Sequence, residues 1–177
     1  MGRLVMLTVA ALCACACTSA KPAPTMPVEA LHWPDAAYPL DLRMSAALDT
    51  CQAASTTAAV AWWEGLVGRD LFTLRVVPAT DSAVMGVAIR GVVSIAPARG
   101  LSTPVTLGET LRPVYAGTPL IHSATIDVIG CSPWVIAHEI GHALGLDHRR
   151  DNTALMSPIE LGGWHVSERE LARFRRL

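Results

Sequence analysis

Charged and aromatic residues are both scarce in this sequence. Charged side chains make up 16% of the 177 residues and aromatic side chains 5%, against 51% hydrophobic residues. The formal net charge of -1 gives no electrostatic basis for binding nucleic acid or an anionic surface. The adjacent Trp62 and Trp63 are predicted to pack in the core rather than to form a binding platform. The length fits one domain, and the apolar fraction suffices for a sizeable core.

The apolar run at residues 4–12 is too short to cross a bilayer as a helix, which takes about 20 residues. Arg3 precedes the run and small residues follow it, which is the build of a secretory signal. Residues 12–15 also resemble the bacterial lipobox, so we predict a signal peptide over residues 1–14 and lipidation of Cys15. Cys17 is the second choice for lipidation. A plain signal peptide cut nearby, giving a secreted protein instead of a cell-envelope lipoprotein, is the alternative.

Cysteine is rare beyond this segment. In an exported protein Cys51 and Cys131 could form one disulfide. Two buried free thiols are the alternative, because the sequence does not give the distance between the two residues.

Proline is concentrated near the N-terminus. Residues 21–39 contain five prolines and little periodicity, so residues 15–37 are predicted to be a lipidated N-terminus followed by an extended tether. Residues 38–177 are predicted to form the folded domain. Residues 41–64 lack Pro and Gly and carry apolar residues at helical spacing, with Gly65 placed to end a long first helix.

Strand signals follow this first helix. In residues 71–77 the alternation predicts a strand with Phe72, Leu74 and Val76 on one face. Further strands are predicted over residues 84–96 (one bent strand or a tight pair), 105–112 and 120–128. Ser132 and Pro133 predict the start of a helix that runs to about Leu144. A capping box of Ser167 and Glu170 predicts a last helix.

Five residues between positions 138 and 148 have the spacing of a metal site. On a helix, His138 and His142 lie one turn apart on one face, within about 40° of each other, with Glu139 on the flank. In a continuous helix His148 would lie about 15 Å beyond His138, so the chain must turn back. Gly145 is placed to allow that turn. Three imidazoles with one open position suit a catalytic zinc ion.

These residues resemble the zinc motif of the metzincin metallopeptidases, His-Glu-x-x-His-x-x-Gly-x-x-His. Residues 154–158 resemble the Met-turn of that family, and the interval from His148 to Met156 and Pro158 is similar to its matrixin branch. The resemblance implies an α+β zincin fold. Its expected parts are a twisted, mostly parallel sheet with an antiparallel edge strand, a long first helix, a zinc helix, the Met-turn and a C-terminal helix.

The resemblance implies that residues 38–177 are a zinc endopeptidase domain acting on peptides or proteins. One zinc ion, held by the three histidines, would activate a water, with Glu139 as general base. Gly145, Met156 and Pro158 would support the metal site, and the strand with Leu107, Gly108 and Glu109 resembles the one that pairs with substrate. We expect a monomer that meets the membrane only through its lipid. The alternative is a non-catalytic zinc-containing lipoprotein, either peptide-binding or structural.

Overall fold

The structure, a computed structural model, describes residues 30–98, 107–150, 154–158 and 164–174. In chain order its elements are η1 (Asp35–Ala37), β1 (Leu40–Ser45), α1 (Thr50–Val67), β2 (Phe72–Val77), β3 (Val92–Pro97), β4 (Gly108–Leu111), β5 (Ala124–Val128), α2 (Pro133–Ala143) and α3 (Glu168–Phe174). Within the described ranges no helix combines the length and the apolar character needed to cross a membrane.

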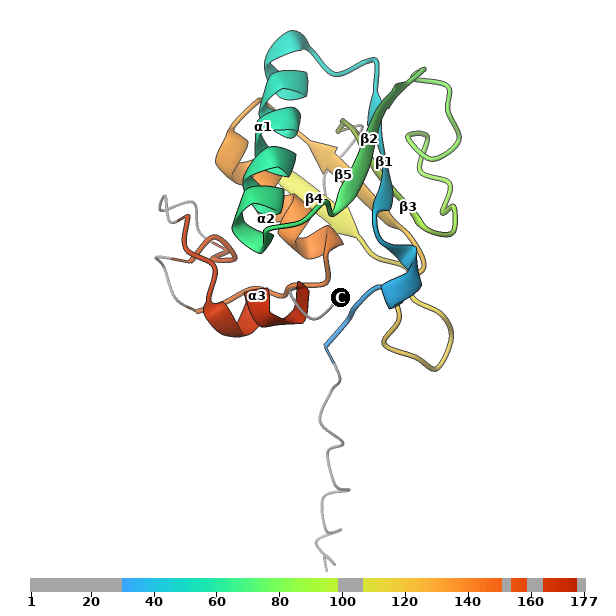
Figure 1. The fold of residues 1–177 in the computed structure, drawn as a ribbon. Helices are drawn as coiled ribbons and strands as arrows, with labels where there is room; N and C mark the ends of the chain where they lie inside the picture. The colour runs from blue at the N-terminus through green and yellow to red at the C-terminus, as the bar shows by residue number, and fades with distance from the viewer. Residues whose placement is uncertain (1–29, 99–106, 151–153, 159–163, 175–177) are drawn as a thin grey trace, which may run out of the picture.

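Five strands form one sheet in the order β2-β1-β3-β5-β4. All neighbouring pairs are parallel except β4 and β5, which are antiparallel, so β4 is an antiparallel edge strand. Helices α1 and α2 lie together on one face of the sheet, and the loop between β2 and β3 lies on the other (Figure 1). The predicted α+β zincin fold, with its mostly parallel sheet and antiparallel edge, is confirmed.

The core between the sheet and the helices is closed by α1. Trp63 is fully buried, and its indole N–H donates to the carbonyl of Ala137 in α2 at 2.9 Å. Trp62 is half-buried and packs edge-on against Trp164 instead. The expectation of core packing therefore holds for Trp63 and only partly for Trp62.

The predicted first helix over residues 41–64 is wrong at both ends. Residues 40–45 form β1, a strand paired on both sides, in which Leu40 and Leu42 are fully buried. Burial between two neighbours decides for the strand, since short apolar runs also fit helical spacing. Helix α1 begins after Asp49, which forms a capping box with Gln52, and ends at Gly68 (φ +82°) rather than at Gly65.

One strand prediction also needs correction. Only the last part of residues 84–96 is a strand, because Gly86 and Gly91 both take positive φ values and residues 82–86 form turns. In β2, Phe72, Leu74 and Val76 share one face as predicted, but Val76 is 62% exposed because β2 is an edge strand. Strands β4 and β5 are shorter than predicted, and residues 105–106 lie outside the described part.

Residues 30–37 belong to the domain, so the tether predicted over residues 15–37 ends too late. Trp33 is 1% exposed, and its indole N–H donates to the carbonyl of Ala143, at the end of α2, at 2.7 Å. Backbone hydrogen bonds join His32 to Pro119 and Ile121. The prolines suggested an extended linker, but the chain here is anchored by a buried indole. Cys15 lies outside the described residues.

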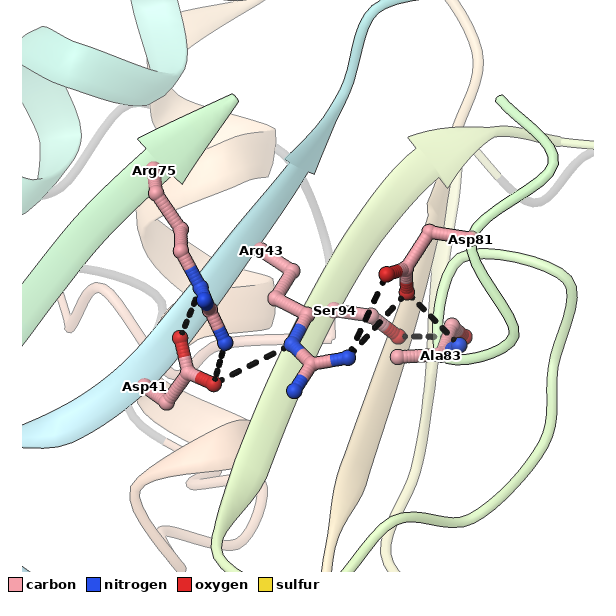
Figure 2. A network of polar contacts seen from close by, with 6 residues as sticks. All are labelled: Asp41, Arg43, Arg75, Asp81, Ala83 and Ser94. Carbon is pink, nitrogen blue, oxygen red and sulfur yellow. Dashed lines mark hydrogen bonds and ion pairs between the residues drawn. The ribbon is translucent and has the colours of Figure 1, made fainter. Parts of the chain in front are cut away.

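Charged side chains alternate in sign across the sheet face opposite the helices. Asp41 contacts both Arg75 on β2 and Arg43 on β1, and Arg43 reaches Asp81 in the loop after β2 at 3.3 Å (Figure 2). We call these four residues the charge ladder. It lies on the sheet face opposite α1 and α2 (Figure 1) and, through the contact of Arg43 with Asp81, holds the β2–β3 loop against that face.

A disulfide joins Cys51 in the first turn of α1 to Cys131, just before α2, with the two Cα atoms 5.6 Å apart. Two hydrogen bonds accompany it. The Ser55 hydroxyl donates to the Cys131 carbonyl at 2.8 Å, and the Gln52 amide donates to the Gly130 carbonyl at 3.1 Å. The start of α2 is therefore tied to α1 both covalently and by polar contacts.

Candidate metal centre

Helix α2 begins and ends where the sequence predicts. The Ser132 hydroxyl accepts from the N–H of Val135, Pro133 occupies the first turn, and Leu144 is the C-terminal cap. Gly145 follows with φ +96°, a left-handed conformation that glycine adopts without a Cβ penalty. A Cβ at this position would also collide with the carbonyl oxygen of Leu31. Gly145 is thus required both by its backbone conformation and by the N-terminal segment packed against it.

The turn at Gly145 brings His148 back to the two histidines of α2. One ligand nitrogen from each of His138, His142 and His148 lies within 4.8 Å of the others. The Nε2 atoms of His138 and His148 are 3.3 Å apart. Two imidazole nitrogens at zinc–nitrogen distances of about 2.0–2.1 Å in a tetrahedral arrangement are separated by about 3.3–3.4 Å. The spacing therefore fits a tetrahedral zinc ion.

Hydrogen bonds on the far side of two rings fix their orientation. Nδ1 of His138 donates to the Leu155 carbonyl at 2.7 Å, and Nδ1 of His142 donates to the Leu146 carbonyl at 2.8 Å. Since a carbonyl can only accept, each Nδ1 must carry the proton, which leaves Nε2 with a lone pair for a metal.

Burial keeps these imidazoles neutral. Desolvation lowers the pKa of His142 to about 3 and also lowers the pKa of His138, although the Leu155 carbonyl acts in the opposite direction. A metal ligand must be the neutral imidazole. At neutral pH neither ring has to lose a proton before it can bind a cation.

The predicted Met-turn lies directly beneath α2. Met156 is buried, and a Cβ at Gly141 would meet its sulfur at 2.5 Å and the Trp63 ring at 3.1 Å. The turn also provides the Leu155 carbonyl that orients His138. Pro158, at its end, is exposed. The contact of the turn with a histidine ligand is thus a backbone hydrogen bond, while the Met156 side chain fills the space left by a glycine.

Glu139 points away from the core toward β4. Its side chain is 5% exposed, and the Thr110 hydroxyl donates to its Oε2 at 2.5 Å. Burial raises the pKa of Glu139 to about 7, with Glu109 adding to this effect and Thr110 and Arg112 opposing it. A carboxyl that titrates near neutral pH is suited to accept and return a proton.

A cleft of about 380 Å³ opens beside these residues. Its lining comprises Gly108, Glu109, Thr110, Arg112, Glu139, His142, Asp147 and His148. Of the three residues predicted to pair with substrate, Gly108 and Glu109 lie on β4 and line the cleft, whereas Leu107 precedes the strand and is 43% exposed. Strand β4 thus borders the same space as His142 and His148.

No contact with the metal site or with the end of α2 was predicted for four residues that make one: Trp33, Thr110, Arg112 and Gly141. Thr110 and Arg112 follow Gly108 at a spacing of two, the strand period, which could have placed all three on one face. Gly141 occupies a variable position of the zinc motif, and nothing in the pattern marks it as necessary. Trp33 stands alone among prolines.

A family model of the matrixins matches residues 125–167, which is less than half of the chain but contains all three histidines and Met156. No curated protein matches the sequence. Among solved structures, the chain is similar to high choriolytic enzyme 1, a hatching enzyme zinc-protease from Oryzias latipes (medaka fish). The sequence identity is 18% and the TM-score 0.37, and the match covers 66% of this chain and 50% of that chain. This chain thus spans half the length of that one, and we draw nothing further from the likeness.

The matrixin match covers the residues that the geometry brings together. It begins in β5, includes the whole of α2 and the turn at Gly145, and extends past the Met-turn. The three-histidine cluster within it fits one catalytic zinc ion. Residues 125–167 therefore resemble the matrixins, and they contain the histidine cluster that fits a zinc ion.

Proposed function

We propose that this protein is a zinc-dependent endopeptidase in which Glu139 is the general base. The observation that carries the proposal is the convergence of three imidazoles beside a buried carboxyl at the wall of an open cleft. His138, His142 and His148 would hold the ion. A bound zinc ion supplies a Lewis acid that lowers the pKa of a coordinated water to about 7 and polarises a substrate carbonyl.

The protein's own groups handle the proton. Glu139 accepts the proton of the attacking water at its carboxylate and then gives it to the leaving amine. Without a metal ion, burial raises the pKa of Glu139 to about 7, and proton transfer is most efficient when the pKa lies near the working pH. The surrounding burial of α2 excludes bulk water from the back of the site.

Substrate would lie along the outer edge of β4. One side of β4 is paired with β5, and its other side has no strand partner in the sheet as described. An extended peptide can add to such an edge by backbone hydrogen bonds. Leu107, Gly108 and Glu109 are the residues assigned to this pairing. Gly145, Met156 and Pro158 keep the supporting role predicted for them.

The zinc content and the cleavage of an unstructured protein such as reduced casein should be measured together. We expect one zinc ion per chain, cleavage that a chelator abolishes and zinc restores, and loss of cleavage in Glu139→Gln with zinc retained. Removing a general base typically costs about 10²–10⁴-fold in rate. If Glu139→Gln still cleaves casein at the wild-type rate, Glu139 is not the base. A wild-type protein that holds zinc and binds peptide without cleaving it would establish the non-catalytic alternative.

We also propose that the protein is exported, with Cys15 lipidated and residues 1–14 removed. The disulfide between Cys51 and Cys131 is compatible with an oxidising compartment outside the cytosol. Cys15→Ser should move the protein from the membrane fraction to the soluble exported fraction and abolish fatty-acid labelling. An unlabelled wild-type protein would show that it is secreted without an anchor.

A further inference from the structure

The inward side of β4 contacts three parts of the metal centre. Gly108 and Thr110 lie on the strand and Arg112 directly follows it, at a spacing of two residues. Because successive side chains of a strand point to opposite faces, these three share one side. Each contacts α2 or the turn that follows α2. The substrate edge and the catalytic helix are therefore joined by one short strand.

Thr110 and Gly108 enclose the Glu139 side chain. The Thr110 hydroxyl lies 2.5 Å from Oε2 of Glu139 and 3.1 Å from its backbone carbonyl. A Cβ at Gly108 would meet the Cγ of Glu139 at 2.7 Å and its Oε1 at 2.9 Å. One residue thus supplies a hydrogen bond to the carboxylate, and the other leaves the space that the carboxylate occupies.

Arg112 binds the turn that carries His148. Its guanidinium donates to the carbonyls of His142 and Leu146 at 3.2 and 3.1 Å and to the Asp147 carboxylate at 3.0 Å. The carbonyls at a helix C-terminus lack partners within the helix, and a cation there also interacts favourably with the helix dipole. The Arg112 side chain is only 17% exposed, so its contacts with the two carbonyls are partly shielded from water, whereas the Asp147 side chain is 69% exposed.

We propose that the inward side of β4 positions the catalytic machinery: Thr110 orients the Glu139 carboxylate, and Arg112 holds the turn that presents His148. The role of Thr110 rests on the proposed function of Glu139, whereas the role of Arg112 requires only that the histidines bind zinc. Thr110 acts through the Glu139 carboxylate and Arg112 through the turn, so both are positioning residues. The two roles predict different defects, one in turnover and one in metal affinity.

Thr110→Val removes the hydroxyl at nearly constant shape, and Thr110→Ser keeps it. We expect Thr110→Val to lower kcat about 10-fold with KM and zinc affinity within 2-fold of wild type, and Thr110→Ser to retain at least half of kcat. Thr57→Val is the matched control, because the exposed Thr57 hydroxyl donates to the Ala53 carbonyl in α1. Wild-type kcat in Thr110→Val, or equal losses in the Val and Ser variants, would overturn the role of Thr110.

Arg112→Met removes the guanidinium and keeps the apolar stem. We expect its zinc affinity, measured by chelator competition, to fall at least 10-fold, both alone and in a Glu139→Gln background. Arg75→Met is the control, since Arg75 lies in the charge ladder on β2 and away from the cleft. Unchanged zinc affinity in Arg112→Met overturns the role of Arg112. Equal losses in Arg112→Met and Arg75→Met would show that the effect is not specific to the turn, and overturn it as well.

The same measurements test the role of Thr110 separately from the endopeptidase activity. Casein cleavage by the wild type with normal kcat in Thr110→Val would overturn positioning by Thr110 and leave the endopeptidase proposal intact. If the wild type cleaves nothing, the endopeptidase proposal fails. In that case a double-mutant cycle tests the contact between Thr110 and Glu139. The free energy of unfolding is measured for Thr110→Val, for Glu139→Ala and for the double variant. Additive losses in that cycle would overturn the role of Thr110, and coupled losses would support its hold on the carboxylate.

Discussion

Helix α2 is held in different ways at its two ends. Its start is tied to α1 by the Cys51–Cys131 disulfide and by hydrogen bonds to residues 130–131. Its end is held by the Trp33 indole on the Ala143 carbonyl, by Arg112 and by the turn at Gly145. The start is held covalently, whereas the end, which carries the metal ligands, is held only by packing and hydrogen bonds.

The separation between the two ends matters for function. His138 follows Cys131 by seven residues, which is about 10 Å of helix at 1.5 Å per residue. His142 and His148 lie farther along, at the end without a covalent link. We therefore expect changes at the start to lower the stability of the domain and changes at the end to weaken zinc binding. The four predictions below test that division.

Removing the disulfide should have the largest effect on stability. The two cysteines are separated by 80 residues, and loop closure over that length stabilises a protein by about 4 kcal/mol. The Cys51→Ala, Cys131→Ala double variant should lose about that much free energy of unfolding in urea. Its folded form should bind zinc as tightly as wild type. A loss of zinc affinity in the folded double variant would refute the proposed division.

Gly145→Ala should disrupt the turn at the C-terminal end of α2. It combines left-handed backbone strain with a clash against the Leu31 carbonyl, so the turn must move and His148 with it. We expect about a 100-fold loss of zinc affinity, which corresponds to about 3 kcal/mol. Gly68→Ala is the matched control, because Gly68 also follows a helix at φ +82° but has nothing within 4 Å of a Cβ. Gly68→Ala should keep full zinc affinity. Equal losses of zinc affinity in the two variants would show that backbone strain alone, without the clash against Leu31, accounts for the loss in Gly145→Ala.

Gly141→Ala and Gly65→Ala should change stability in opposite directions. Both glycines lie inside helices, where alanine is favoured by about 1 kcal/mol. A Cβ at Gly65 meets nothing within 4 Å, whereas one at Gly141 collides with the Met156 sulfur. We expect Gly65→Ala to stabilise the domain slightly and Gly141→Ala to destabilise it by about 2 kcal/mol. Thermal unfolding measures both, and a stabilised Gly141→Ala would mean that the Met-turn adapts freely.

Trp33→Phe should have the smallest effect and the most selective one. It removes the hydrogen bond to the Ala143 carbonyl, which is worth about 1 kcal/mol, and keeps most of the apolar contact. Trp63→Phe removes the corresponding bond to Ala137 in the middle of α2. Both variants should lose similar stability in urea, but only Trp33→Phe should weaken zinc binding, by a few fold. Equal zinc affinities would show that the N-terminal segment does not act on the metal turn.

The elements best predicted from the sequence are those with local signals. Ser132, Pro133 and Gly145 mark the ends of α2 through chemistry contained within a few residues, and the structure has those ends. The sequence predicts a helix where β1 forms, because the alternation of Leu40, Leu42 and polar residues covers only one strand length and is too short to distinguish a strand from a helix. Whether residues 40–45 form a strand or a helix depends on the two strands that pair with them. The sequence of one segment does not show which other segments it will pair with.

The residues of the site also differ in whether local sequence predicts them. The three zinc ligands and Glu139 follow from spacing along one helix and one turn. Thr110 and Arg112 contact them from a strand about 30 residues earlier, so their roles depend on the packing of β4 against α2. Trp33 contacts the end of α2 across an even longer stretch of chain. Contacts between distant segments are set by the tertiary fold, which residue spacing does not encode.

The charge ladder has a consequence for how the chain reaches this fold. A slip of β1 by one residue against its neighbours would turn Leu40 and Leu42 outward and bring Asp41 and Arg43 under the helices. The ladder lies at the surface with its side chains 17–51% exposed, and surface ion pairs contribute only about 0–1 kcal/mol, but burying the same charges fully costs several kcal/mol each. The ladder therefore adds little to the stability of the native sheet. It specifies the strand register instead, because misaligned parallel pairings would bury its charges and be too unfavourable in free energy to compete during folding.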